Sequence, residues 1–235
     1  FIQLFQHMFE DVQSKNPDLL SNSVKRDFLR SNMEIKNLSI LFPLEGGNVK
    51  DVIRLLKLDN IQTIDLFLRY ESFTHFDQLI IDSEQSSEHP FTPKQILDKV
   101  RKLCILTHER DENNLPHLLS RCENLEEIEL HRRCKIVPDL PGFKNLKLSK
   151  LKKINFTGSA ITGTGLKNIL SVSDNLEEII LLNCKQLSNL PNLESVNLSN
   201  LKKINLSRTK INDDNLKKVL SKCENLEELY LSGCA

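Results

Sequence analysis

Side chains suited to non-covalent contacts recur at regular spacing in the second half of this 235-residue chain. They include carboxylates, amides, hydroxyls and exposed aliphatic groups, which can hydrogen-bond or bury apolar surface. Such groups in combination are typical of surfaces that recognise another protein. One set comprises Glu129, Asn155, Ile180, Asn205 and Tyr230, and the other His131, Thr157, Leu182, Ser207 and Ser232. From the two sets we predict that the partner-binding residues are Glu129, His131, Asn155, Ile180, Leu182, Asn205 and Tyr230.

Residue types that support catalysis or bind metals do not gather in this way. The six histidines are scattered, and no histidine shares a repeat position with a cysteine. The sequence has no glycine-rich phosphate loop, nucleophile elbow or metal-ligand spacing. We therefore expect no enzymatic activity, no catalytic residue and no bound metal or cofactor in this stretch.

A repeated hexapeptide places the two sets of side chains. It begins at Leu125, Leu151, Leu176, Leu201 and Leu226, positions that are 26, 25, 25 and 25 residues apart. Apolar and polar residues alternate within it, which predicts a short strand whose aliphatic side chains point inward. A period of this length carrying L-x-x-[IL]-x-[LF] is typical of leucine-rich repeats, in which stacked units share one core and form a parallel sheet.

The segments that follow these strands alternate between two types. After the second and fourth strands the apolar spacing predicts a helix, such as residues 215–222 with Asp213 or Asp214 as the cap. In the first and third units proline disfavours a helix and predicts irregular or 3-10 structure. The prolines concerned are Pro138, Pro141 and Pro191. The full sequence repeat is therefore a pair of units, about 50 residues long.

The third position of the hexapeptide and the residue before it alternate in charge. The third position reads Glu127, Lys153, Glu178, Lys203 and Glu228, and the one before it reads Glu126, Lys152, Glu177, Lys202 and Glu227. Parallel strands lie about 4.8 Å apart, so both positions form ladders of alternating sign. We interpret these ladders as mutual support of the sheet rather than as a binding surface.

Weaker copies of the strand pattern precede the regular repeats. They fall at 35–40, 61–66, 76–81 and 100–105, but the unit beginning at Ile61 is too short for a strand and a helix. We divide the chain into residues 1–34, residues 35–99 with divergent repeats, and residues 100–235 with regular repeats. The last residues follow the strand of a further unit, so we expect the repeats to be truncated there. Apolar residues at helical spacing in 1–34 predict an N-terminal helical cap.

The regular units resemble the cysteine-containing, ribonuclease-inhibitor-like class of leucine-rich repeats. The resemblance rests on LEELYLSGC at 226–234, on Cys184 at the equivalent position, and on INDDNL followed by Cys223-Glu224-Asn225. It implies that a residue after each strand satisfies backbone groups of the turn; that position holds Arg133, Ser159, Cys184, Thr209 and Cys234. It also implies a curved α/β solenoid, with parallel strands on the concave face and helices or irregular segments on the convex face. Such proteins recognise other proteins through the concave face.

Two alternative functions stay open. Members of this class serve as substrate-recognition adaptors of F-box ubiquitin ligases, and residues 1–34 have a faint likeness to an F-box at Met8-Phe9. The usual proline start is missing, and the chain has no tryptophan. The other alternative is a structural repeat region of a larger sensor, effector or enzyme.

Bulk properties narrow the choice of partner and compartment. The chain has 32 basic and 32 acidic residues, and this zero net charge argues against nucleic-acid binding. No apolar run is long enough to predict a membrane span. The six cysteines lack zinc-type spacing and are interpreted as buried thiols of a cytoplasmic protein. We expect a monomer that binds a protein partner.

Overall fold

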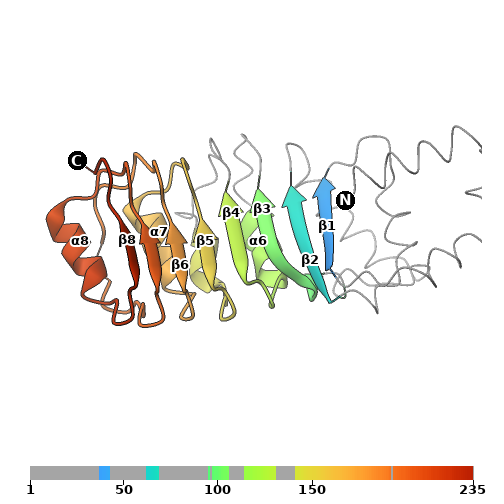
Figure 1. Ribbon diagram of the computed structural model, residues 1–235. Coiled ribbons are helices and arrows are strands. Elements are labelled where there is room, and N and C mark those ends of the chain that lie inside the picture. Colours follow the sequence, from blue (N-terminus) through green and yellow to red (C-terminus); the bar gives the residue numbers. More distant parts are fainter. Residues whose placement is uncertain are drawn as a thin grey trace, which may run out of the picture.

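Eight parallel strands form one sheet in which each strand lies beside the next strand of the sequence (Figure 1). The computed structural model describes residues 37–42, 62–68, 95, 97–105, 114–130, 141–191 and 193–234. The strands are β1 (Asn37–Phe42), β2 (Thr63–Leu68), β3 (Val100–Ile105), β4 (Glu127–Leu130), β5 (Lys153–Asn155), β6 (Glu178–Ile180), β7 (Lys203–Asn205) and β8 (Glu228–Tyr230). The chain thus has an α/β fold built on an all-parallel sheet, an arrangement compatible with a solenoid.

The sequence repeat sets the register of the sheet. Ile128, Ile154, Ile179 and Ile204 are partners on successive strands β4 to β7. All four side chains are at most 2% exposed, and they form part of one continuous core with the leucines that begin the first four hexapeptides. The predicted alternation of inward aliphatic and outward polar residues is therefore confirmed for β4 to β7.

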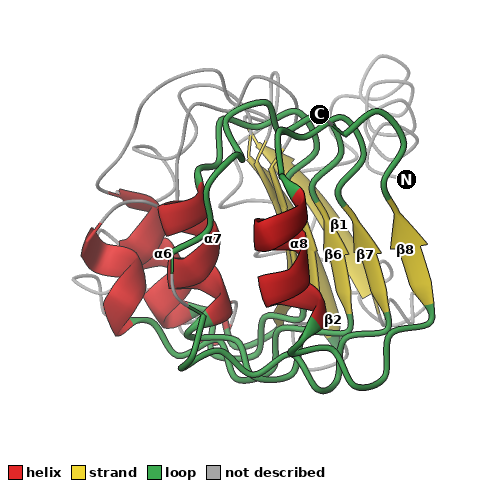
Figure 2. Cartoon of the chain, turned by 90° about the vertical axis from the view of Figure 1, so that its left-hand side faces the viewer, coloured by secondary structure: helices red, strands yellow, loops and turns green. Residues whose placement is uncertain are grey.

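The layer behind the sheet alternates between helices and irregular segments, as the prolines predict. The α-helices given in full by the described residues are α6 (Asn114–Arg121), α7 (Gly163–Leu170) and α8 (Asp213–Leu220), and they lie on the same side of the sheet (Figure 2). Between α6 and α7 lies the 3-10 helix η3 (Pro141–Asn145), which contacts both. Between α7 and α8 the described residues around Pro191 form neither a helix nor a strand. The two-unit repeat is confirmed.

The predicted bounds and cap of the last helix were wrong. Helix α8 begins at Asp213 and ends at Leu220, two residues before the predicted 215–222 at each end. Its N-cap is Asn212, whose Oδ1 accepts a hydrogen bond from the Asn215 amide at 3.0 Å. Asp213 and Asp214 lie instead in the first turn, where their negative charges favour the positive end of the helix dipole.

The alignment of the divergent repeats was also wrong by two residues. Leu66 pairs with Leu103, and Ile64 pairs with Val100 across a register shift, so Leu66 occupies the position assigned to Ile64. Strand β2 pairs directly with β3, and the weaker copy predicted at 76–81 lies outside the described residues. The predicted helical cap or F-box in 1–34 also lies outside them.

The turns after β5, β6, β7 and β8 share one geometry. Gly158, Asn183, Arg208 and Gly233 all adopt positive φ, between 57° and 70°. The next residue then contributes a side chain to the turn: the Cys184 thiol donates to the Phe156 carbonyl at 3.0 Å, and the Cys234 thiol donates to the Leu206 carbonyl at 3.1 Å. In one unit the Thr209 hydroxyl donates to the Leu206 carbonyl of its own turn at 2.7 Å.

Replacement of Ser173 by alanine is expected to raise the free energy of unfolding by about 1 kcal/mol, because its fully buried hydroxyl has no hydrogen-bond partner among the described residues. The matched control is Ser159→Ala. The Ser159 hydroxyl accepts from the Ile161 amide at 3.4 Å, so its loss should lower stability by about 1 kcal/mol. Urea unfolding of the two variants beside the unmodified protein measures both effects. A destabilising Ser173→Ala would show that the hydroxyl is satisfied in solution.

Candidate functional site

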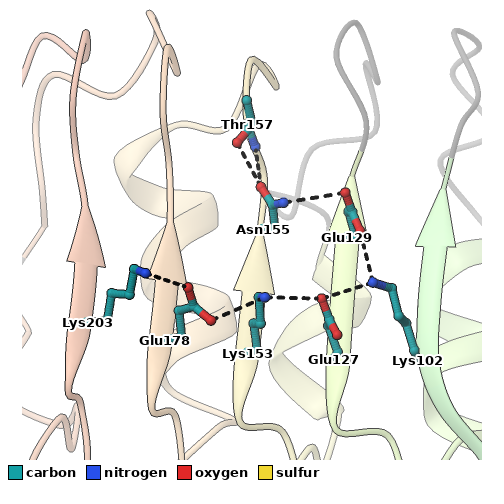
Figure 3. Close-up of polar contacts among 8 residues, drawn as sticks. All are labelled: Lys102, Glu127, Glu129, Lys153, Asn155, Thr157, Glu178 and Lys203. Atoms are coloured by element: carbon teal, nitrogen blue, oxygen red, sulfur yellow. Dashed lines mark hydrogen bonds and ion pairs between the residues drawn. The ribbon is translucent and has the colours of Figure 1, made fainter. Parts of the chain in front are cut away.

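The face of the sheet opposite the helices carries a continuous ladder of alternating charges (Figure 3). The ladder starts at β2 and ends at β8, and its members are Asp65, Lys102, Glu127, Lys153, Glu178, Lys203 and Glu228. Each of its lysines contacts glutamates on both neighbouring strands or on one neighbouring strand twice. Lys153 Nζ lies 3.6 Å from Glu127 and 3.2 Å from Glu178, and Lys203 Nζ lies 3.6 Å from Glu178 and 3.2 Å from Glu228.

The N-terminal part of this ladder is the most crowded. Lys102 Nζ pairs with Glu127 at 3.1 Å and with Glu129 at 3.2 Å. Burial favours the neutral amine of Lys102, but the hydrogen bonds and attraction of the two glutamates outweigh it and raise its pKa. Burial also raises the pKa of Asp65, and attraction to Lys102 opposes that effect. This end of the ladder is held together by short contacts around one ammonium group.

At the other end of the ladder, the contact between Glu228 and Lys203 shifts the pKa of both groups in the direction that favours their charged forms. The Tyr230 hydroxyl donates to Glu228 at 2.8 Å and, together with Lys203, holds the pKa of Glu228 below its usual value. The same carboxylate raises the pKa of Lys203 and of Tyr230. The Lys203 ammonium also lies 5.6 Å from the centre of the Tyr230 ring. Because the pKa of Glu228 falls and that of Lys203 rises, this pair stays charged on both sides of neutral pH.

A second ladder follows the strand entrances. Lys152 Nζ lies 2.8 Å from Glu126, and Lys202 Nζ lies 2.9 Å from Glu177. These pairs line an open groove of about 480 Å³ together with Ser149, Lys150, Asn175, Asn200 and Asn225. The groove is lined by polar and charged residues, and four of its five charged groups form the two ion pairs, so its lining alone gives no preference for one class of ligand.

A column of asparagines along this groove links units to the ones before them. The side-chain amides of Asn124, Asn175 and Asn225 donate to the carbonyls of Asp98, Ser149 and Ser199, at 2.7 to 2.8 Å. Asn200 donates to the Asp174 carbonyl at 3.5 Å. Lys150 interrupts the column, and its ammonium donates to the Asn124 side chain at 2.6 Å. Sequence reasoning missed this column, although an asparagine precedes the first leucine in four of the five hexapeptides.

The predicted binding residues are brought into two columns on the strand face, with different internal roles. Asn155 and Asn205 make the same hydrogen bond to the turn after their strands. Their Oδ1 atoms accept from the backbone amides of Thr157 and Ser207 at 3.2 and 3.0 Å. The Asn155 amide also reaches Glu129, at 3.4 Å. These polar residues therefore stabilise the exits of their own strands.

The predicted apolar residues lie on the same face. Ile180 and Leu182 are half-buried, so they are less exposed than the sequence predicts. Their side chains are aliphatic and form no hydrogen bonds with the turns. Tyr230 is the most exposed large hydrophobic residue of the described chain, at 45%. His131 lies outside the described residues, so the structure brings six of the seven predicted residues together on one face.

The described residues hold no other cluster that suggests chemistry. Among them, no group of three or more histidine, cysteine or acidic side chains is placed to hold a metal ion. Burial raises the pKa of the Cys122 thiol to about 12 and that of Cys223 to about 11, which keeps both thiols protonated. No helix in the same residues has the length and apolar character needed to cross a bilayer.

No model of a known protein family matches the chain, and no curated protein shows significant similarity to it.

Proposed function

We propose that this chain is a protein-recognition module that binds its partner through the strand face. The observation that carries the proposal is the position of Ile180, Leu182 and Tyr230, which present apolar surface among polar and ionised residues. Apolar residues surrounded by polar ones are typical of the energetic centre of a protein–protein contact. The partner is a protein rather than a nucleic acid, because the charges of this face are balanced.

We further propose that the fold is a curved leucine-rich repeat solenoid of the cysteine-containing class, with a helical cap in 1–34. The support comes from the 25-residue register of β5 to β8 and from the turns, where Cys184 and Cys234 donate to backbone carbonyls of the preceding unit. We place the protein in the cytoplasm as a monomer. Buried, protonated thiols such as Cys122 act there as small core residues.

Replacing Ile180 and Leu182 together by glutamate is expected to weaken partner binding by at least about 100-fold, or about 2.7 kcal/mol. The new carboxylates would remove the apolar contact and place unpaired charge in the interface. The partner is first identified by affinity capture with chemical cross-linking, and the dissociation constant is then measured by calorimetry with the purified partner. Circular dichroism and thermal unfolding establish that the variant is folded.

The matched control adds two glutamates on the opposite side of the sheet, as Lys217→Glu with Lys218→Glu on α8, where both lysines are exposed. This control should bind as tightly as the unmodified protein. Full binding by the folded Ile180/Leu182 variant would move the contact away from the strand face.

A further inference from the structure

The charged groups of the strand face already satisfy one another. From β4 to β7 the ladder members Glu127, Lys153, Glu178 and Lys203 each contact an opposite charge on both neighbouring strands. Figure 3 draws these contacts from Lys102 to Lys203. A charged partner residue that docks on one of them must displace an existing pair. It also meets both signs within one strand spacing of about 4.8 Å, so attraction and repulsion largely cancel. The ladder therefore offers little net attraction to a charged side chain.

Three polar atoms beside the charges are also engaged in internal hydrogen bonds. The Oδ1 atoms of Asn155 and Asn205 accept from the turns that follow their strands, and the Tyr230 hydroxyl donates to Glu228. A partner that hydrogen-bonds to these atoms competes with bonds of 3.2, 3.0 and 2.8 Å. Competition with existing bonds of this kind yields little net free energy.

The aliphatic side chains of Ile180, on β6, and of Leu182, just after it, have no such competitor. Ile180 and Leu182 are half-buried and Tyr230 is 45% exposed, so each gains burial when another molecule covers it. Burial of apolar area contributes about 25 cal/mol per Å² and does not depend on charge. The binding energy of this face is thus concentrated on its least polar residues.

We infer that the partner segment docking on β6 to β8 is uncharged and apolar, presenting aliphatic or aromatic side chains to Ile180, Leu182 and Tyr230. This inference rests on the proposed function and adds the chemistry of the partner. It implies that affinity is nearly independent of salt, because no unpaired charge of the ladder contributes to it.

The probe is a displayed library of random peptides, selected in parallel on the intact chain and on the Ile180→Glu/Leu182→Glu variant. Peptides enriched on the intact chain alone are synthesised, and their dissociation constants are measured in about 0.1 M and about 1 M NaCl, between which the Debye length falls from about 10 Å to about 3 Å. We expect these peptides to be rich in aliphatic and aromatic residues and poor in charged ones. Their affinities should change by less than about twofold between the two salt concentrations.

Two results would overturn the inference in different ways. Enriched peptides that are rich in lysine and arginine or in aspartate and glutamate, and whose affinity falls more than about tenfold in high salt, would refute the apolar partner. If the double variant no longer bound those peptides, the proposed function would still stand. If no peptide distinguished the intact chain from the folded variant, both the inference and the proposed function would fail.

Discussion

Deletion of residues 176–200 is expected to unfold the protein, whereas deletion of the longer stretch 151–200 should leave it folded. The shorter deletion removes one unit and joins the units of β5 and β7. Lys152 and Lys153 would then lie beside Lys202 and Lys203, so like charges would replace the attractive contacts of both ladders. The longer deletion removes a pair of units and brings Glu126 and Glu127 beside Lys202 and Lys203, which preserves the alternation.

The larger part of the expected difference in stability between the two deletion variants comes from the layer of helices. Packed helices require axes about 8–10 Å apart, close to two strand spacings of about 4.8 Å. The structure meets this requirement because η3 separates α6 from α7, and irregular chain separates α7 from α8. Deletion of 176–200 makes α7 and α8 direct neighbours, so one helix must leave the core. Exposing three large apolar residues such as Leu166, Ile169 and Leu170 costs about 5 kcal/mol or more, a large share of a typical total stability.

Urea unfolding followed by circular dichroism separates the two deletions. The 151–200 variant should show a cooperative transition at a lower urea concentration than the full chain, because it has fewer interfaces between units. The 176–200 variant should show no cooperative transition at 25 °C. Equal stability of the two variants would mean that neither the charge alternation nor the spacing of the helices specifies how units are stacked.

Gly163→Ala is expected to destabilise the protein by about 3 kcal/mol. Gly163 is the buried first residue of α7, and a Cβ atom there would overlap the carbonyl oxygen of Asn189 in the next unit and lie 3.2 Å from the Leu190 Cα. Both obstacles are backbone, so the clash cannot be relieved by a change of rotamer. Without the clash, alanine would stabilise the first turn by about 0.4–1 kcal/mol through its effect on the unfolded chain.

The sign of the effect therefore tests the close approach of α7 to the following unit. Thr164→Ala is the matched control, since Thr164 is the next helical residue and is exposed; it should change stability by less than about 0.5 kcal/mol. The change in the urea midpoint at constant slope measures both variants. A stabilising Gly163→Ala would show that the segment at Asn189 moves away from the helix at little cost.

The alternating sequence pattern made the strands β4 to β8 predictable, and the prolines made the irregular segments behind them predictable. Ile154 and Ile204 alternate with lysine and asparagine in a pattern that only a strand with one buried face fits, and Pro191 excludes a helix in its unit. The alignment of β1 and β2 with the regular repeats was not predictable in the same way. A register shift after Ile64 inserts a residue opposite β2, and such an irregularity leaves the hydrophobic pattern unchanged.

Local hydrogen bonds explain the remaining differences. Asn212 and Asp213 are both favourable N-cap residues, so the pattern alone cannot decide between them; the backbone of Asn212 is extended and the helix starts after it. For the candidate site, the sequence identified the outward positions, but not that Asn155 and Asn205 cap their own strands. That role requires an amide two residues ahead to turn back toward the side chain, which is a property of the folded turn.

The interruption of the asparagine column at Lys150 has a mechanical consequence. Elsewhere in the column an asparagine side chain donates a hydrogen bond to a backbone carbonyl of the preceding unit. Here the longer and more flexible side chain of Lys150 donates to another side chain, that of Asn124. These hydrogen bonds help to transmit tension from one unit to the next. We therefore expect the bond across the junction between β4 and β5 to stretch more easily than those made by asparagine to a backbone carbonyl. Among the junctions from β3 to β8, we expect a pulling force to open this one first, which would leave Ile180, Leu182 and Tyr230 together in one block.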